Sequence, residues 1–229
     1  MNERTTPGWA ELAGNRHAPR PVRQTGRMRR TDGRTSDFGV LVVCTGNICR
    51  SPAGERLLRH TLSATRVDVT SAGTHAVVGH PVEPSMARLL SADGIDASGF
   101  AARGLTERLV RDADLVLTME TGHRSAVVQT HPQALGRAFT LREFAYLLEA
   151  CRDADPTAYL QDKGTDPGAR LRALVELATD SRARRLSPPC PAPDIEDPYR
   201  RGDEAYQLAY AAIRAAADAI VAHVTGDPG

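Results

Sequence analysis

The chain has 229 residues, 41% of them hydrophobic, which is enough to bury one good-sized core. Its formal net charge of +1 gives no reason to expect nucleic acid or a membrane surface as an obligatory partner, and no 18-residue apolar run predicts a transmembrane helix. The four cysteines are too few and too scattered for a disulfide framework or a zinc site. We therefore expect a reduced cytoplasmic compartment and no metal or other cofactor.

Residues 1–37 are rich in arginine and poor in large apolar residues, so they cannot bury enough surface to become ordered. We predict a disordered tail here and one folded domain over residues 38–229. Docking of the tail on an acidic partner or on lipid head groups is the functional alternative. Charge runs of this kind are usually solvated without a specific partner.

The next stretch, residues 38–51, reads FGVLVVCTGNICRS and predicts a buried strand that enters a helix through a short loop. Residues 38–43 are mostly aromatic or β-branched, which is typical of a parallel strand covered on both faces. Ser51 and Pro52 indicate a helix start, because proline at the first helical position lacks an N–H that would be unpaired anyway. The loop between strand and helix is formed by residues 45–50.

This loop predicts an anion site beside a nucleophile. Backbone N–H groups and the positive end of the helix dipole converge there, and Gly46 and Asn47 tolerate the positive φ that an inward-curling loop requires. Cys44 lies at the rim, where the same field stabilises its thiolate, and the Ser51 hydroxyl can donate to the sulfur. Arg50 offers a planar fork of donors that holds two phosphate oxygens. Together these groups indicate attack on a phosphoryl group through a phosphocysteine intermediate.

A purely structural interpretation is the alternative. A cysteine that ends a buried strand is most often a small core residue, and the spacing C-x5-R can arise by chance in an arginine-rich chain. Here, however, the spacing occurs together with a preceding strand, a glycine and an asparagine inside the loop, and a Ser-Pro helix start. The complete string therefore favours catalysis.

The rest of the chain alternates helices and strands, which predicts a three-layer α/β sandwich around a four-stranded parallel sheet. In such a fold the ligand site lies at the carboxyl ends of the strands, where Cys44 is expected. Apolar spacing and turn residues predict helices at 52–64, 83–94, 105–110, 121–130, 141–150 and 203–224, and further strands at 67–71, 114–119 and 137–140.

One further amphipathic pattern lies within residues 151–193, where Leu171, Leu174 and Val175 recur at helical spacing in 168–184. We predict an additional helix that covers part of the sheet edge or the cleft, flanked by flexible segments. A dimer or partner contact through this helix is the alternative. We expect a monomer or a weak dimer.

An acidic segment at residues 194–199 supplies the remaining chemistry. Expelling a phenolate from phosphorus needs a proton donor near the leaving oxygen, and a carboxyl group on a loop across the cleft can serve. Asp194, Glu196 and Asp197 are all candidates from the residues alone. The acid must be protonated when substrate binds, and it would then take a proton from the water that hydrolyses phosphocysteine.

Four motifs carry a resemblance to a known family. VCTGNICRSPAGE at 43–55, SAGT at 71–74, DADLVLTME at 112–120 and DPYR at 197–200 are similar to the low-molecular-weight protein tyrosine phosphatases, especially the bacterial type associated with exopolysaccharide export. The resemblance implies the phosphotyrosine phosphatase I-like fold, hydrolysis of protein phosphotyrosine, and an insertion at 151–193.

The same resemblance implies roles for individual residues. Cys44 would be the nucleophile, and the DPY motif selects Asp197 as the acid. Ser71 would hydrogen-bond Asn47 and support the loop, while Tyr199 would line the entrance and stack on the substrate ring. The phosphate-binding residues would be Thr45, Gly46, Asn47, Ile48, Cys49 and Arg50.

The chain departs from the family pattern at two places. Val77 and Val78 stand where eukaryotic members place an aromatic residue against the substrate ring, a difference shared with several bacterial members. Phe100 replaces a histidine that supports the loop in many relatives, which puts one supporting contact in doubt. Cys49 resembles the second cysteine that in some members forms a reversible disulfide with the nucleophile and shields it from overoxidation; a small packed thiol is the alternative.

Three other functions fit parts of the sequence. An arsenate reductase on the same fold needs resolving cysteines nearer to the nucleophile than Cys151 and Cys190. Relatives that are protein-arginine phosphatases carry threonine where Ile48 stands. A phosphotyrosine-binding module without turnover is disfavoured by the intact nucleophile, arginine and acid. The expected partners are phosphotyrosine proteins, among them an autophosphorylating bacterial tyrosine kinase.

Overall fold

The computed structural model of the chain describes residues 36–152, 166–185 and 189–226. Residues 1–35 of the predicted disordered tail lie outside the described residues, as do 153–165 and 186–188 of the inserted segment. Asp37, which the prediction assigned to the tail, belongs to the folded domain. Its N–H donates to the Arg66 carbonyl oxygen at 2.9 Å, and its carboxylate pairs with the Arg66 side chain at 2.8 Å.

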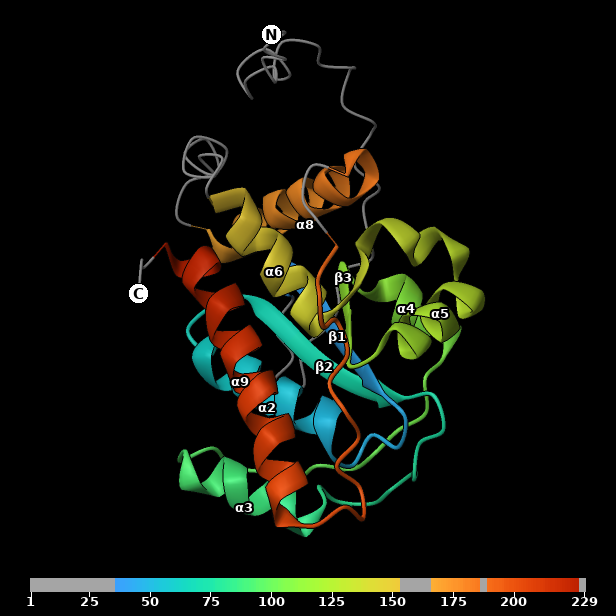
Figure 1. The fold of residues 1–229 in the computed structure, drawn as a ribbon, viewed down its shortest axis with the longest axis vertical. Helices are drawn as coiled ribbons and strands as arrows, with labels where there is room; N and C mark the ends of the chain where they lie inside the picture. The colour runs from blue at the N-terminus through green and yellow to red at the C-terminus, as the bar shows by residue number, and fades with distance from the viewer. Residues whose placement is uncertain (1–35, 153–165, 186–188, 227–229) are drawn as a thin grey trace, which may run out of the picture.

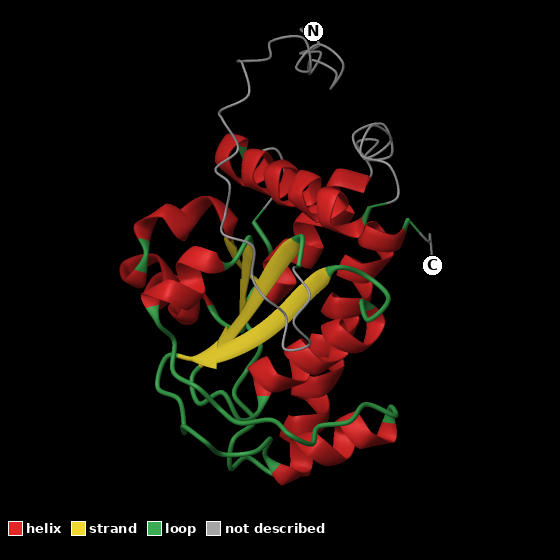
Figure 2. Cartoon of the chain, turned by 180° about the vertical axis from the view of Figure 1, so that it is seen from behind, coloured by secondary structure: helices red, strands yellow, loops and turns green. Residues whose placement is uncertain are grey.

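Four parallel strands, drawn in yellow in Figure 2, form the predicted sheet. Their order is β2-β1-β3-β4. The central strand β1 pairs with both β2 and β3, and every one of its residues is buried, which explains its uninterrupted apolar run. Cys44 therefore ends the strand in the middle of the carboxyl edge. The strands are β1 (Phe38–Cys44), β2 (Val67–Gly73), β3 (Leu115–Thr118) and β4 (Ala138–Thr140).

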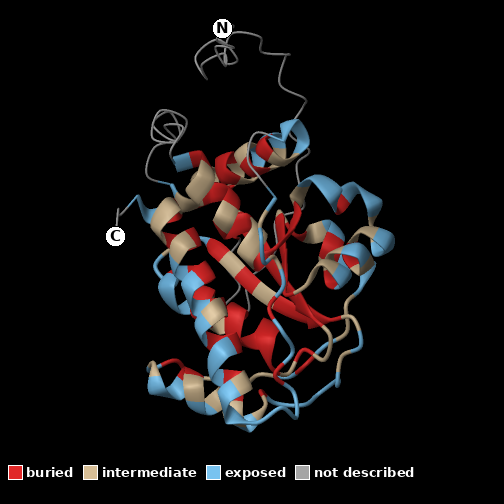
Figure 3. Cartoon of the chain, viewed as in Figure 1, coloured by how far each residue is buried: buried red, intermediate tan, exposed pale blue. Residues whose placement is uncertain are grey.

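Helices cover both faces of the sheet, and the strands between them are almost entirely buried (Figure 3). Val40 and Val42 of β1 belong to the core on one face, and Leu41 and Val43 to the core on the other. This alternation confirms the three-layer α/β sandwich (Figure 1). The first face carries α2 (Arg50–Thr61), α6 (Leu141–Arg152) and α9 (Asp203–Thr225), with α3 (Pro84–Ala92) outside α2 and α9; the second carries α4 (Glu107–Asp112), α5 (Thr121–Thr130) and the 3-10 helix η1 (Pro132–Arg137).

The helix predicted inside the insertion is α8, Pro167–Arg184. It packs against α6 and against the beginning of β1, where Gly168 lies beside Phe38 and the Arg172 guanidinium stacks 5.5 Å from the centre of the Phe38 ring. Of the two expected locations, the cleft is wrong, whereas the edge strand β4 is contacted, because Arg182 of α8 stacks on Phe139 and donates to the Ala138 carbonyl oxygen. Its apolar side covers the amino ends of the strands, and Cys44 lies at their opposite ends.

In the described part of the chain, α9 is the one helix that is long and apolar enough, by length and composition, to span a membrane. A core helix of a soluble fold passes the same test, and α9 packs on α2, α3 and α6 with Tyr206, Ile213 and Ile220 buried. It is the helix that the sequence predicted at 203–224, and it packs in the core.

Candidate active site

The loop between β1 and α2 turns its carbonyl oxygens away from the site. A trans peptide holds its N–H opposite to its C=O, so the N–H groups that follow these carbonyls point inward, toward the start of α2. The loop is thereby shaped as an anion site. The outward contacts, each 2.8 to 2.9 Å long, run from the N–H groups of Thr74, His75, Val77 and Glu83 to the carbonyl oxygens of Cys44, Thr45, Gly46 and Ile48.

The Asn47 side chain fixes the shape of this loop through its hydrogen bonds. It adopts φ of 53°, the left-handed conformation that the sequence predicted, whereas Gly46 does not. Its side-chain amide donates to the hydroxyls of Ser51 at 2.9 Å and Ser71 at 2.8 Å, and its oxygen accepts from the Arg103 N–H at 2.9 Å. The predicted Ser71–Asn47 hydrogen bond is therefore present.

The support that the sequence left in doubt at Phe100 comes from other residues. Phe100 lies beneath the Arg56 guanidinium, 5.8 Å from its carbon to the ring centre. The Ser71 hydroxyl, which receives the Asn47 amide, donates onward to the Glu55 carboxylate at 2.6 Å. Arg103 adds a 2.8 Å bond to the Ser71 carbonyl oxygen. The loop thus has its polar support without a histidine at position 100.

Gly73, the last residue of β2, lets that strand approach the loop closely. A Cβ at this position would lie 2.5 Å from the Thr45 carbonyl oxygen and 3.0 Å from the Asn47 Cβ, so no other residue fits without movement. The SAGT motif contains this glycine, but the sequence did not reveal the contact that requires it.

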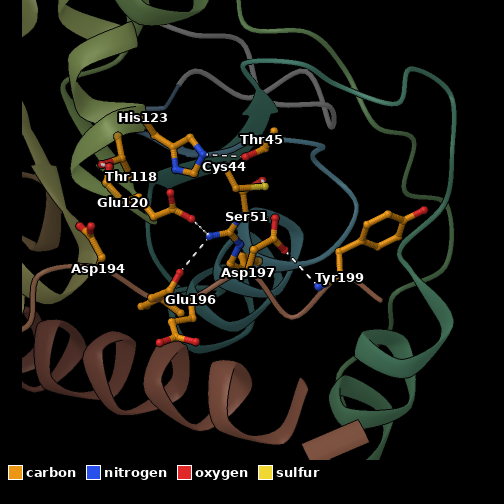
Figure 4. A network of polar contacts seen from close by, with 12 residues as sticks. Cys44, Thr45, Ser51, Thr118, Glu120, His123, Asp194, Glu196, Asp197 and Tyr199 are labelled. Carbon is orange, nitrogen blue, oxygen red and sulfur yellow. Dashed lines mark hydrogen bonds and ion pairs between the residues drawn. The ribbon is translucent and has the colours of Figure 1, made fainter. Parts of the chain in front are cut away.

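Cys44 and Ser51 meet at the centre of the site. The sulfur lies 2.9 Å from the Ser51 Oγ, and both residues are buried (Figure 4). The first residue of α2 is Arg50, so the sulfur also lies near the positive end of that helix. The sulfur thus has a hydroxyl group and a helix amino end as its neighbours.

The Arg50 guanidinium is buried, with 1% of the residue exposed, and is held by oxygens from two other segments. One terminal nitrogen donates to the Glu120 carboxylate and, at 2.9 Å, to the Ile195 carbonyl oxygen; the other pairs with Asp197 Oδ2 at 2.7 Å (Figure 4). Glu120 follows the end of β3 and was not identified as a site residue from the sequence. Its position next to the carboxyl end of a strand is the signal that was available.

The three acidic candidates of residues 194–197 occupy different places. Asp194 caps α5, because its carboxylate accepts from the Thr121 N–H at 2.7 Å. Glu196 is exposed and pairs with Arg201 at 2.8 Å. Asp197 contacts Arg50 and is the one carboxylate of the three that reaches the phosphate loop.

Exposed aliphatic and aromatic side chains lie on segments that contact the loop or Asp197: Val77, whose N–H donates to the Gly46 carbonyl oxygen, its neighbour Val78, and Tyr199. Val77 and Val78 are 39% and 71% exposed, and Tyr199 is 44% exposed. The Tyr199 N–H donates to Asp197 Oδ1 at 3.1 Å, and the Arg200 guanidinium stacks 5.1 Å from the centre of the Tyr199 ring. These three side chains are therefore exposed apolar groups on segments next to the loop and to Asp197.

Cys49 is a buried thiol on the same loop. Burial raises its pKa to about 12, and the Tyr206 hydroxyl, 4.0 Å from its sulfur, lowers the pKa slightly against that effect. Cys44, Cys49, Cys151 and Cys190 are all free. Cys49 is therefore protonated at neutral pH.

One more group joins the site without having been predicted from the sequence. His123, in the first turn of α5, places its Nε2 2.8 Å from the Thr45 Oγ1. Within residues 36–152, 166–185 and 189–226, no group of three or more histidine, cysteine and acidic side chains has an arrangement suited to a metal ion.

Comparison with known proteins gives a consistent family. The model of the family described as low molecular weight phosphotyrosine protein phosphatase matches residues 39–187, so its match ends before the segment that carries Asp197. The low molecular weight protein-tyrosine-phosphatase Etp of Escherichia coli K12 is 39% identical over 148 residues, which are 65% of this chain and 94% of that protein.

Solved structures agree with this result. Vibrio vulnificus Wzb in complex with benzylphosphonate superposes with a TM-score of 0.55 at 29% identity, over 80% of this chain and 97% of that one. The YwlE arginine phosphatase of Geobacillus stearothermophilus gives a TM-score of 0.57 at 26% identity, over 80% of this chain and 90% of that one. The fold is therefore shared by phosphatases described as acting on different phosphorylated residues.

Proposed function

The chain belongs to the low molecular weight phosphotyrosine protein phosphatase family and is a protein tyrosine phosphatase, and from this premise we propose that it hydrolyses protein phosphotyrosine through a phosphocysteine intermediate. One observation carries the proposal: the Cys44 sulfur meets the Ser51 hydroxyl at the start of α2, and Asp197 pairs with the guanidinium of the adjoining Arg50, at the end of one loop whose carbonyl oxygens point outward. A nucleophile, an anion clamp and an acid are the three parts that this reaction requires.

In the first step the Cys44 thiolate attacks phosphorus in line with the tyrosyl oxygen. The loop N–H groups and the Arg50 fork bind the three non-bridging oxygens and stabilise the charge that they carry in the transition state. The Ser51 hydroxyl, 2.9 Å from the sulfur, stabilises the thiolate before attack. Asp197 gives its proton to the departing phenolate, so the phosphorus–oxygen bond breaks and a neutral tyrosine leaves.

In the second step water replaces tyrosine. Asp197, now a carboxylate, takes a proton from that water as the oxygen attacks phosphorus, and the phosphorus–sulfur bond breaks. Inorganic phosphate and the Cys44 thiolate are released, and Asp197 is again protonated. Every proton is accounted for within the chain and the water, so the cycle uses no metal ion.

The rim supports phosphotyrosine as the substrate side chain. Val77, Val78 and Tyr199 present apolar surface beside the loop, which suits an aromatic ring more than a hydroxyalkyl phosphate. The structure of Vibrio vulnificus Wzb holds benzylphosphonate, a ring joined to a phosphorus oxyanion, which supports the same chemistry. Relatives that are protein-arginine phosphatases carry threonine at the position of Ile48. The isoleucine therefore argues against phosphoarginine as the substrate.

Further aspects of the function are part of the same proposal. We infer a cytoplasmic enzyme that acts on phosphotyrosine proteins, including an autophosphorylating bacterial tyrosine kinase, as a monomer or weak dimer. Cys49 would protect Cys44 by forming a disulfide after Cys44 is oxidised, for example by a peroxide. An arsenate reductase would need resolving cysteines nearer to Cys44 in the sequence. Cys151 lies on α6 and Cys190 in the segment after α8, so their positions support a phosphatase.

The purified protein should release phosphate from p-nitrophenyl phosphate and from phosphotyrosine peptides with EDTA present. Cys44→Ser should abolish turnover, while Cys190→Ser, the same change at a half-exposed cysteine, should preserve it. Turnover retained by Cys44→Ser would refute the nucleophile. Tight phosphopeptide binding without turnover in the unaltered protein would establish a binding module instead. Capture of phosphoproteins from lysate with Cys44→Ser or Asp197→Ala would then identify the substrate.

A further inference from the structure

A buried histidine that the proposed mechanism does not use lies beside the nucleophile. His123 is 6% exposed, and its Nε2 is 2.8 Å from the Oγ1 of Thr45, the residue that follows Cys44 (Figure 4). The second ring nitrogen, Nδ1, is buried and has no hydrogen-bond partner among the described residues. Most buried polar atoms are paired, so this arrangement calls for an explanation.

The environment of His123 sets its protonation. Burial lowers the pKa of the ring, with Arg50 acting in the same direction, while Glu120, Asp197 and Asp194 oppose that shift. A ring with a lowered pKa is neutral at pH 7 and carries a single N–H. A buried N–H without an acceptor is rarer than an unpaired acceptor, so the proton belongs on Nε2 and not on Nδ1.

This assignment fixes the role of the Thr45 hydroxyl. Its oxygen accepts the Nε2–H of His123, so its own proton points elsewhere. Thr45 is only partly buried and lies at the rim of the loop that holds Cys44, where that proton has no acceptor among the described residues. The hydroxyl is thus a free donor at the edge of the proposed phosphate site.

We propose that His123 is a positioning residue that aims the Thr45 hydroxyl at a phosphoryl oxygen of the bound substrate. The proposal rests on the proposed function, because it assumes a phosphoryl group above Cys44. A neutral ring and a hydroxyl add a donor for the oxyanion without adding a second charge beside Arg50. Hydrogen bonds to charged oxygens are stronger than neutral ones, so the added donor has a measurable effect on affinity.

The test measures competitive inhibition of p-nitrophenyl phosphate hydrolysis by inorganic phosphate. Thr45→Val, which replaces the hydroxyl by a methyl of similar shape, and His123→Leu should each raise the inhibition constant about tenfold. Thr45→Ser keeps the hydroxyl and should remain close to the unaltered protein. The double variant Thr45→Val/His123→Leu should be no weaker than Thr45→Val alone, because both changes remove one interaction.

Rescue by a second amide donor separates positioning from packing. The amide of Gln in His123→Gln reaches about as far as Nε2 and should restore most of the phosphate affinity, whereas the shorter Asn in His123→Asn should not. His131→Leu removes an imidazole from the other end of α5, where it faces Glu107 at 3.6 Å, and serves as the matched control.

Two results would overturn the proposal: an unchanged inhibition constant in folded His123→Leu or His123→Asn, or additive effects in the double variant. Thermal unfolding reports whether each variant is folded. These results are independent of the nucleophile, since failure of the proposed function appears as turnover by Cys44→Ser or as no turnover in the unaltered protein.

Discussion

The Arg50 guanidinium shows how the site balances its charges. A buried cation is costly unless it is paired, and Arg50 has two carboxylate partners, Glu120 and Asp197, and one carbonyl partner, Ile195. Binding of a phosphoryl dianion adds negative charge to a cluster that already contains two carboxylates and one guanidinium. The bound phosphoryl group would therefore compete with Glu120 and Asp197 for the Arg50 guanidinium.

At the same scale, Asp197→Ala should affect substrates according to their leaving groups. Phenyl phosphate, whose leaving oxygen needs a proton, should lose about 100-fold or more in kcat. p-Nitrophenyl phosphate should lose clearly less, because nitrophenolate leaves without protonation. Steady-state kinetics on the two esters measures the difference, and Glu196→Ala, which removes an exposed carboxylate paired with Arg201, is the control. Equal losses on both esters would show that Asp197 is not the proton donor.

The second cysteine of the loop gives a pH-dependent prediction. Burial raises the pKa of Cys49 to about 12, so the fraction of reactive thiolate at pH 7 is very small and grows about tenfold with each pH unit. In Cys44→Ser, iodoacetamide should alkylate Cys49 slowly at pH 7, with a rate that keeps rising up to pH 10. Mass spectrometry of the modified peptides measures the rates, and the half-exposed Cys190 reports reagent activity in the same sample. A rate that levels off below pH 9 would contradict the raised pKa.

At the scale of elements, the close contact between β2 and the phosphate loop requires a glycine at position 73. In Gly73→Ala the new Cβ would lie 2.5 Å from the Thr45 carbonyl oxygen, so the loop must shift. We expect a loss of about 1–3 kcal/mol in the free energy of unfolding, as for other overpacked sites, and about a hundredfold loss of kcat/KM from the displaced loop. Urea unfolding and steady-state kinetics measure the two effects.

Gly104 offers a matched control for this change. It forms an isolated parallel bridge with Gly73, yet a Cβ at Gly104 would meet no atom within 4 Å. Gly104→Ala should therefore leave stability and activity nearly unchanged. Similar losses in both variants would mean that backbone freedom, and not the contact with Thr45, is what position 73 requires.

The strands and helices were predictable where the local pattern alone decides them. The helix predicted at 121–130 has those bounds, and the helix predicted at 168–184 is α8, because apolar spacing and breaker residues mark both. The 3-10 helix η1 was missed, since six residues, about two turns of a 3-10 helix, are too few to show a period. The sequence left the location of α8 open between the sheet edge and the cleft, because periodicity reveals an apolar face but not the surface that it covers.

At the scale of the whole molecule, the site combines residues that are close in sequence with residues that only the fold brings together. Cys44, Arg50 and Ser51 lie within eight positions of one another, so the sequence alone was enough to bring them together. Glu120 and His123 reach the loop only because β3 pairs with β1, and strand order cannot be read from local pattern. Asp197 was singled out by family resemblance, and its contact with Arg50 now supplies a physical reason for the same choice.

The end of the molecule opposite the site is closed by α8, and Arg182 makes several of the contacts that hold this helix. Its guanidinium stacks 4.2 Å from the centre of the Phe139 ring and donates to the carbonyl oxygens of Ala138 at 2.9 Å and Leu135 at 2.6 Å. Arg182→Ala removes these three contacts and the 3.7 Å ion pair with Glu143, so we expect about 2 kcal/mol lower stability.

Because these contacts lie at the amino ends of the strands, Arg182→Ala should leave kcat and KM for p-nitrophenyl phosphate unchanged at a temperature where the variant is folded. Urea unfolding and steady-state kinetics on the same preparation separate the two effects. Arg184→Ala, on the same helix but exposed and paired only with Asp180 at 3.6 Å, should change stability by less than about 0.5 kcal/mol. A fall in kcat of folded Arg182→Ala would instead show that α8 and the phosphate loop are coupled through the sheet, because β4 and β1 are joined only by way of β3.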